Sequence, residues 1–191
     1  AGNVGSDNDT AVTVQNGGGG GAPVVVSYSS EAANDGYIKA NADGSSPALG
    51  TLESSMGLAL GRGTDAKYNR AVLSFDTSAI PDTATIVGAT LNVKYRSASG
   101  DPWSNPAGNT LTIDLVNGCF GACTLETTDF SAAATAAGVA GIVRFTAGTQ
   151  NSAAFNAAGL AAISKTARTQ LRLRFSQNQS ATHYLWIGSG V

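Results

Sequence analysis

The chain has 191 residues, enough for one well-packed domain with an extension, and only 13% of them are charged, about half of the usual share. Its formal net charge is −2 and Lys and Arg form no cluster, so we expect no nucleic-acid partner and no anionic membrane surface. No apolar run reaches the roughly 18 residues of a membrane-spanning helix, so we expect no membrane insertion.

The chain opens with a short strand pattern followed by glycines. The stretch TAVTV at 10–14 alternates in the manner of a strand, and NGGGGG at 16–21 has no packing preference. We therefore expect an N-terminal extension over residues 1–22 and one module over residues 23–191. The candidate donor strand, meaning a strand that completes the sheet of another chain, consists of Asp9, Thr10, Ala11, Val12, Thr13, Val14 and Gln15.

Alternation of apolar and polar residues continues through the module and predicts half-buried antiparallel strands. Residues expected to face the core are Leu73, Phe75, Leu91, Val93, Ile113, Leu171 and Leu173. Shorter strand patterns lie at 23–28, 36–40, 57–60, 141–145 and 183–187. The stretch NSAAFNAAGLAAISK at 151–165 instead predicts one short helix with Ser152 as its N-cap. The fold class is all-β, an antiparallel β-sandwich with one helix and an N-terminal extension strand.

Two cysteines, Cys119 and Cys123, lie in the sequence NGCFGAC. The flanking glycines allow a tight turn that brings the sulfurs together, which predicts a disulfide; two buried free thiols are the alternative. A zinc site needs four ligands, and no others lie nearby. The disulfide and the weakly charged, polar surface together favour a secreted protein.

The segment YNRAVLSFDTSAIPDTATIVGATLNVKY at 68–95 resembles the core of DNRLRE-type modules, secreted jelly-roll domains related to carbohydrate-binding modules. The resemblance rests on Arg70 at the start of an apolar strand, on SFDTSAIP and on ATIVGATLNV. It implies a jelly roll at an extracellular or cell-surface location, and it carries no ligand with it. Members of that family continue past HYLWIGSGV into a closing strand, so we expect this sheet to lack one. The stretch AGNVGSDNDTAVTVQN resembles the last strand of a bacterial immunoglobulin-like repeat.

The sequence shows no recognisable arrangement of catalytic side chains. The single imidazole, His183, lies in a strand pattern beside Tyr184 and Trp186, and the 13 acidic residues form no recognisable carboxylate pair. We expect no enzyme, and we expect Trp186 in the core.

Metal chemistry is similarly weak. Asp7, Asp9, Asp35, Asn41 and Asp43 lie in oxygen-rich loops that suit Ca²⁺, but no twelve-residue calcium loop is present and Asx turns account for the same residues. We therefore predict no metal site and no cofactor.

One loop suits a glycan. In GDPWSNPAG, the indole of Trp103 can stack on a sugar ring while Asp101 or Asn105 bonds to its hydroxyl groups. In the alternative interpretation, the indole folds back over the edge of the sandwich.

The N-terminal strand leads to the main functional expectation. A sandwich that lacks a strand exposes unpaired main-chain groups, and a tethered strand from another copy can fill the gap. We expect a non-catalytic extracellular structural protein that assembles head to tail into a filament, with other copies of itself as partners. The alternative is a carbohydrate-binding module of a larger secreted bacterial enzyme or adhesin, with polysaccharide as its partner. The strand can also fold back onto its own domain.

Overall fold

The computed structural model describes the backbone at residues 10–17, 23–51, 57–145 and 150–188. The strands in chain order are β1 (Thr10–Gly17), β2 (Val24–Ser29), β3 (Gly36–Ala40), β4 (Ala48–Leu49), β5 (Leu58–Arg62), β6 (Tyr68–Asp76), β7 (Thr85–Ser99), β8 (Leu111–Asn117), β9 (Ala136–Ile142), β10 (Gln150–Ala154), β11 (Arg168–Phe175) and β12 (His183–Ile187). One 3₁₀ helix, η1, spans Thr127–Phe130, and one α-helix, α1, spans Ala157–Ala162. The expected all-β sandwich with a short helix is confirmed.

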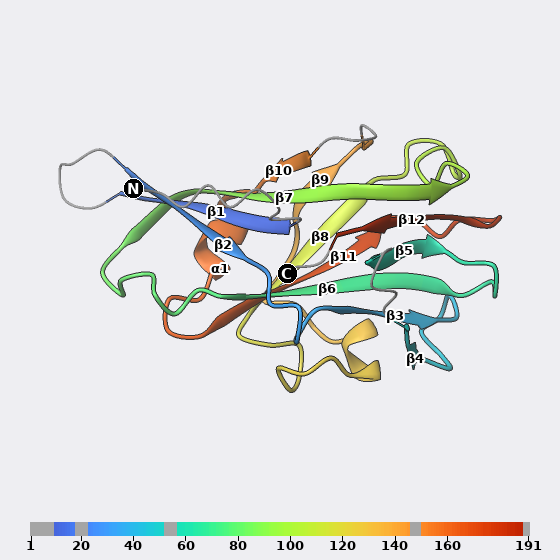
Figure 1. Ribbon diagram of the computed structural model, residues 1–191, viewed down its shortest axis with the longest axis horizontal. Coiled ribbons are helices and arrows are strands. Elements are labelled where there is room, and N and C mark those ends of the chain that lie inside the picture. Colours follow the sequence, from blue (N-terminus) through green and yellow to red (C-terminus); the bar gives the residue numbers. More distant parts are fainter. Residues whose placement is uncertain (1–9, 18–22, 52–56, 146–149, 189–191) are drawn as a thin grey trace.

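The strands form two layers that share the long strand β7 (Figure 1). In one layer β2, β1, β7 and β10 lie side by side. The other layer follows the order β12-β5-β6-β11-β8-β9, with β3 and β4 attached to β6. β7 reaches both layers because its first part pairs with β1 and β10, while its last residues pair with β12. All of these strand pairs are antiparallel.

The core lies between the layers and contains the residues that alternation predicts. The seven predicted side chains, from Leu73 to Leu173, are all fully buried. Alternation identifies them because successive side chains of a strand point to opposite faces of the sheet. At about 25 cal/mol per Å² of apolar surface removed from water, each such side chain stabilises the fold by about 1.5–3 kcal/mol.

The predicted helix begins later than expected. Ser152 is not its N-cap, because residues 150–154 form β10 and pair with β7. The N-cap is Asn156, whose side chain accepts a hydrogen bond from Gly159 N at 3.0 Å. Tertiary pairing therefore overrides the helical spacing of the first residues. The strand expected over 141–145 is also displaced and lies at Ala136–Ile142. Among the described residues, no helix is long and apolar enough to cross a membrane.

Candidate functional site

The N-terminal strand β1 fills a slot between two other strands. On one side it pairs with residues 85–93 of β7, and on the other with residues 24–29 of β2. Without β1, the strands β2 and β7 would be separated by the width of one strand, and both would present unpaired main-chain groups. Residues 10–15 of the predicted donor strand thus lie within a sheet of their own chain. Asp9 lies outside the described residues.

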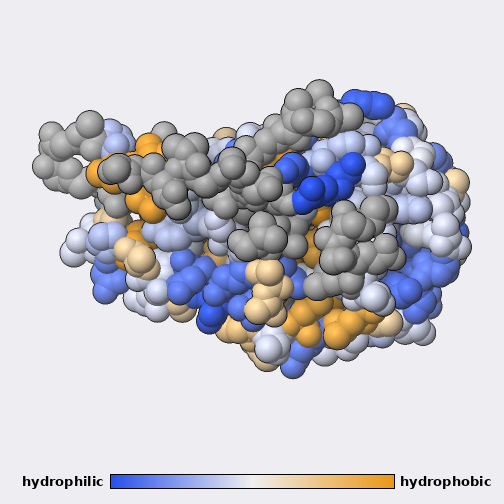
Figure 2. Space-filling view, in the orientation of Figure 1, coloured by the Kyte–Doolittle hydropathy of each residue, from blue (hydrophilic) through white to orange (hydrophobic). Residues whose placement is uncertain are grey.

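β2 is the outer edge of this layer, and its first three residues are apolar and exposed. Val24, Val25 and Val26 have exposed fractions of 58%, 55% and 38%. Figure 2 shows hydrophobic residues gathered at the left end of the molecule, over the start of this strand. Tyr28, further along β2, packs partly against the core. The exposed apolar side chains of β2 therefore lie at its start, while Tyr28 reaches the core.

The main chain of Val25 points away from β1. On the side of β7 away from β1, Phe155 N donates to Ala89 O at 2.9 Å, so the main-chain groups of Ala89 point away from β1. Val14 lies opposite Ala89 in the β1–β7 pair, so the main-chain groups of Val14 point away from β7 and toward β2. The partner of Val14 in β2 is Val26. Because successive residues of an antiparallel strand bond to alternate sides, the N–H and C=O of Val25 point outward, available to a further strand.

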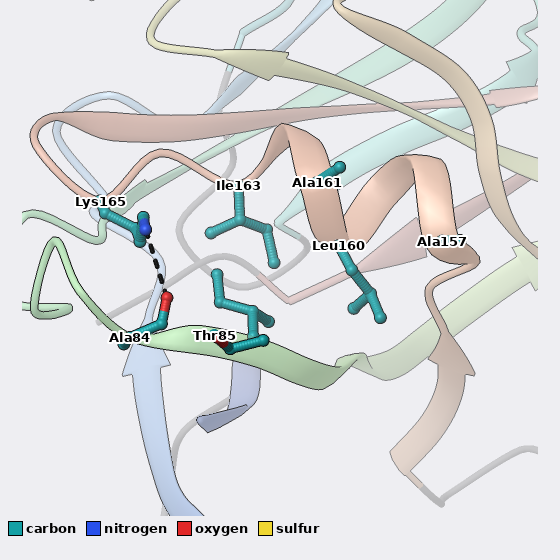
Figure 3. Close-up of a pocket in the computed structure, with 8 residues that line it drawn as sticks. Ala84, Thr85, Ala157, Leu160, Ala161, Ile163 and Lys165 are labelled. Carbon is teal, nitrogen blue, oxygen red and sulfur yellow. Dashed lines mark hydrogen bonds between the residues drawn. The ribbon is translucent and has the colours of Figure 1, made fainter. Parts of the chain in front are cut away.

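An apolar groove lies between the start of β7 and α1 (Figure 3). It has a volume of about 460 Å³, Leu160 and Ile163 point into it, and Ile86 also lines it. A second hollow of about 330 Å³, which also borders Leu160, continues it along residues 87–90. β10 pairs with β7 only at residues 90–94, so in the described part of the chain no strand covers residues 85–88 on this side. We call this surface the β7–α1 groove.

The β7–α1 groove is almost free of charge. The one ionisable residue among those that line it is Lys165, whose Nζ donates to the main-chain oxygens of Ala84, at 3.2 Å, and Asp82. The ammonium group is thus bound to the loop before β7, at the end of the groove (Figure 3). The groove therefore suits an uncharged apolar segment.

The structure contradicts the exposed indole on which the predicted glycan site depends. Trp103 is only 8% exposed, and its Nε1 donates to Ile142 O at 3.0 Å. Its ring packs against Phe145 and Phe175, with centroid distances of 5.2 and 5.4 Å. The indole folds back over the sandwich because its apolar ring gains more from the core than from water. A sugar ring has no free face of Trp103 on which to stack.

The polar residues of the same loop are engaged with the protein. Asp101 forms an ion pair with Arg144 at 2.7 Å. Burial raises the pKa of Asp101 and the hydrogen bond from Arg144 lowers it, and the net shift of the pKa is downward. Asn105 Oδ1 accepts from Ser180 N and Ser180 Oγ, both at 2.9 Å. The loop is thus closed by contacts to neighbouring segments.

His183 has a structural role. Its Nδ1 accepts a hydrogen bond from Asp101 N at 2.8 Å. Gly100 allows this close approach, because its φ is +71° and a Cβ there would lie 2.2 Å from the imidazole Nδ1.

The candidate calcium ligands organise loops. Asp35 is buried and accepts from Ser30 Oγ at 2.7 Å and Ser74 N at 2.9 Å, while Asp43 accepts from Ser45 N at 2.9 Å. Asn41 Nδ2 donates to Ser45 Oγ at 2.9 Å. Among the described residues, no three His, Cys, Asp or Glu side chains gather as a metal site would require. Asp7 and Asp9 lie outside the described residues.

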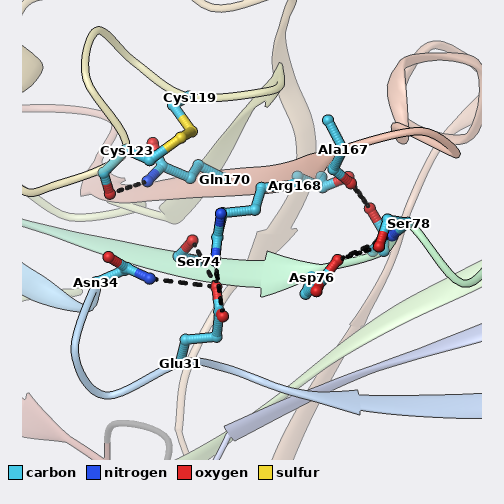
Figure 4. Close-up of polar contacts among 12 residues, drawn as sticks. Glu31, Asn34, Ser74, Asp76, Ser78, Cys119, Cys123, Ala167, Arg168 and Gln170 are labelled. Atoms are coloured by element: carbon cyan, nitrogen blue, oxygen red, sulfur yellow. Dashed lines mark hydrogen bonds and ion pairs between the residues drawn. A yellow bond between two sulfur atoms is a disulfide. The ribbon is translucent and has the colours of Figure 1, made fainter.

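The predicted disulfide between Cys119 and Cys123 is present (Figure 4). Gln170 of β11 holds this loop, since its Oε1 accepts from Phe120 N at 2.9 Å and its Nε2 donates to Cys123 O at 3.2 Å. The disulfide and Gln170 together fix the loop over the sheet.

A salt bridge near the disulfide joins the end of β2 to β11. Arg168 forms a bidentate pair with Glu31, at 2.7 and 3.1 Å (Figure 4). The hydrogen bond from Arg168 lowers the pKa of Glu31, so both groups are charged at neutral pH. This pair ties the inner end of β2 to the other layer.

One pocket was not predicted from the sequence. It has a volume of about 320 Å³ and is lined by three aromatic residues, Tyr37, Tyr184 and Trp186, together with polar groups. Trp186 is half-buried and lies 5.7 Å from Tyr37 and 6.4 Å from Tyr184, ring centre to ring centre, in edge-to-face geometry. The alternation of Tyr184 and Trp186 was the only available signal. The expectation of a core tryptophan is thus met in part, because one part of Trp186 packs on the core and the other borders this pocket.

The polar side of the aromatic pocket carries no net charge. Lys39 and Asp65 form an ion pair at 2.9 Å, in which the hydrogen bond to Asp65 raises the pKa of Lys39. Asn69 lies beside them, with its side-chain nitrogen bonded to Gly61 O at 2.9 Å. The pocket thus combines aromatic rings with hydrogen-bond donors and acceptors, both charged and neutral.

Comparisons of this chain with protein-family models, curated proteins and solved structures return no match.

Proposed function

We propose that this protein is a non-catalytic extracellular structural protein that assembles head to tail by strand exchange. In this assembly, β1 of one copy occupies the slot between β2 and β7 of the next copy, and its own slot is filled in turn by another β1. The donated strand and the accepting slot are different surfaces of each copy. The contact is therefore head-to-tail, and its product is a filament when the rotation between copies does not close a ring.

The observation that supports strand exchange is that β1 pairs on both sides but is joined to β2 by a Gly-rich link, residues 18–23, with the sequence GGGGAP. Gly-rich segments of this length span on the order of 12 Å as random coils and more when extended. Exchange keeps every strand pair of the sheet and changes only the path of the link. The single-chain and exchanged forms then differ little in contact energy, and a high protein concentration favours the exchanged form.

Cross-linking between two variants tests the exchange. Thr13 and Thr90 are opposite each other in the β1–β7 pair, and the Cα atoms of opposite residues lie about 4.5–5.5 Å apart, a separation that a disulfide can span. Chains carrying only Thr13→Cys are mixed with chains carrying only Thr90→Cys, refolded together at high concentration and oxidised.

Exchange predicts a disulfide-linked pair of chains on a non-reducing gel. A mixture of Thr13→Cys with Thr64→Cys, an exposed position on the other layer, serves as the matched control and yields no linked pair. If the first mixture also remains as single chains, β1 stays in its own sheet and strand exchange is wrong.

The aromatic pocket favours saccharide binding as a second candidate function. Rings of the Tyr184 and Trp186 kind stack on the apolar face of a pyranose, while carboxylate, ammonium and amide groups bond to its hydroxyls. Because Lys39 and Asp65 neutralise each other, the pocket suits a neutral sugar.

Tryptophan fluorescence tests saccharide binding directly. The chain has two tryptophans, and only Trp186 lines the pocket. A panel of neutral oligosaccharides should change the emission of the protein, and Trp186→Phe should remove the response. Trp103→Phe is the matched control and should retain the response. An emission that no member of the panel alters would reject this function.

A further inference from the structure

We propose that the exposed edge of β2 in one copy docks on the β7–α1 groove of another copy and extends its sheet. This inference rests on the proposed role in self-assembly and adds to it a second contact, different from the exchange of β1. The two surfaces that meet are residues 24–26 of β2 and residues 85–88 of β7.

Both surfaces lack a neighbouring strand in the described part of the chain. β2 pairs only with β1, and Val25 directs its main-chain groups outward. On β7, strand β10 ends opposite Thr90, and Phe155 N makes the last contact at Ala89 O. The main chain at 85–88 therefore continues past the end of β10 without a strand beside it. Two such edges satisfy each other when they pair.

The side chains of the two surfaces match in character. Val24, Val25 and Val26 are exposed apolar residues, and an edge strand of this kind normally carries a charge that blocks pairing. The groove offers Ile86, Leu160 and the 50% exposed Val87. Neither surface places a free charge at the contact, since the Lys165 ammonium is bonded to main-chain oxygens.

The occupant must come from a second copy. Within one chain, β1 lies between β2 and β7, whereas the groove lies on the opposite side of β7. The β2 edge cannot reach its own groove without breaking the β1 pairs. A contact between two different surfaces of identical chains is head-to-tail, so it leaves one β2 edge and one groove free on each pair of copies and lets further copies add.

The test uses protein in which β1 is locked in its own chain. The double variant Thr13→Cys/Thr90→Cys, folded and oxidised at low concentration, prevents exchange of β1, and its sedimentation is then measured over a range of concentrations. We expect oligomers that grow with concentration. Val25→Lys and Val87→Lys, each added to the locked chain, should weaken association at least tenfold. Leu49→Lys, at a residue that is 49% exposed on β4, is the matched control and should leave association unchanged.

Mixing the two lysine variants tests the head-to-tail geometry. Val25→Lys retains an intact groove and Val87→Lys retains an intact β2 edge, so an equimolar mixture should form dimers and nothing larger. The proposal is overturned if the locked chain stays monomeric at every concentration, or if neither lysine weakens its association. Failure of strand exchange has a separate readout, the absence of cross-linked chains from the Thr13→Cys and Thr90→Cys mixture.

Discussion

Replacing Asp114 by Asn should destabilise the fold more than any surface change. Asp114 lies on β8 and its side chain is 1% exposed. Its carboxylate accepts from Arg172 at 3.0 Å, from Arg174 at 2.8 and 3.2 Å, and from Gly138 N at 3.1 Å. Asp114→Asn keeps the size of the side chain but removes the charge that these two guanidinium groups face.

The cost follows from the burial of the partner. The Arg172 side chain is 7% exposed, so water cannot replace the lost carboxylate, and breaking a buried ion pair from one side costs about 3–5 kcal/mol. Arg174 is 28% exposed and recovers part of its solvation. For a domain of this length each kcal/mol lowers the melting temperature by about 2–4 °C, so we expect a loss of roughly 6–20 °C.

The cost should also depend on pH in a defined direction. Burial raises the pKa of Asp114, but the hydrogen bonds and charge of Arg174, together with the hydrogen bonds from Arg172 and Gly138 N, outweigh burial and lower the pKa below its usual value. A carboxyl whose folded pKa is lowered contributes its full stability above the unfolded pKa, about 3.9, and loses it as the pH falls through the folded pKa. The difference in the free energy of unfolding between wild type and Asp114→Asn should therefore be largest at neutral pH and become smaller below about pH 4.

Urea unfolding followed by tryptophan fluorescence measures both effects. The matched control is Asp65→Asn, which breaks an ion pair whose side chains are 35% and 41% exposed and should cost at most about 1 kcal/mol. A loss below about 1 kcal/mol for Asp114→Asn would show that Arg172 reaches water when its partner is removed, and the reasoning from burial would fail.

Three further changes test other parts of the structure. Leu91→Ala, at a fully buried position of β7, should cost about 2–5 kcal/mol in urea unfolding, and a value near zero would place Leu91 outside the core. Reducing the Cys119–Cys123 disulfide should add two hydrogens to the intact mass and cost about 2 kcal/mol, because the closed loop is short; an unchanged mass would show free thiols. Burial raises the pKa of Asp129, which means that its ionised form opposes folding as the pH rises above the unfolded value. Asp129→Asn can still accept a hydrogen bond from Glu126 N. Any loss of stability of this variant relative to wild type, measured by urea unfolding, should become smaller or change sign as the pH rises from 4 to 7. A loss that grows with pH would contradict this.

The sequence by itself identified the features that depend on neighbouring residues. Alternation along β6, β7, β8 and β11 is a property of each strand alone, and it located the core because one face of each strand is buried. The disulfide could be predicted for the same reason, since four positions separate Cys119 from Cys123. The helix start was misplaced because β10 gains its partner from β7, about 60 residues away.

Only the tertiary structure decided the features that depend on distant segments. Trp103 became a core residue because Phe145 and Phe175 cover it, and nothing in its own loop indicates their approach. The aromatic pocket joins Tyr37 to Trp186, and the slot of β1 joins two strands about 60 residues apart. Local alternation states which face of a strand is apolar but not which strand lies beside it, because pairing depends on loop closure and on packing between segments far apart in the chain.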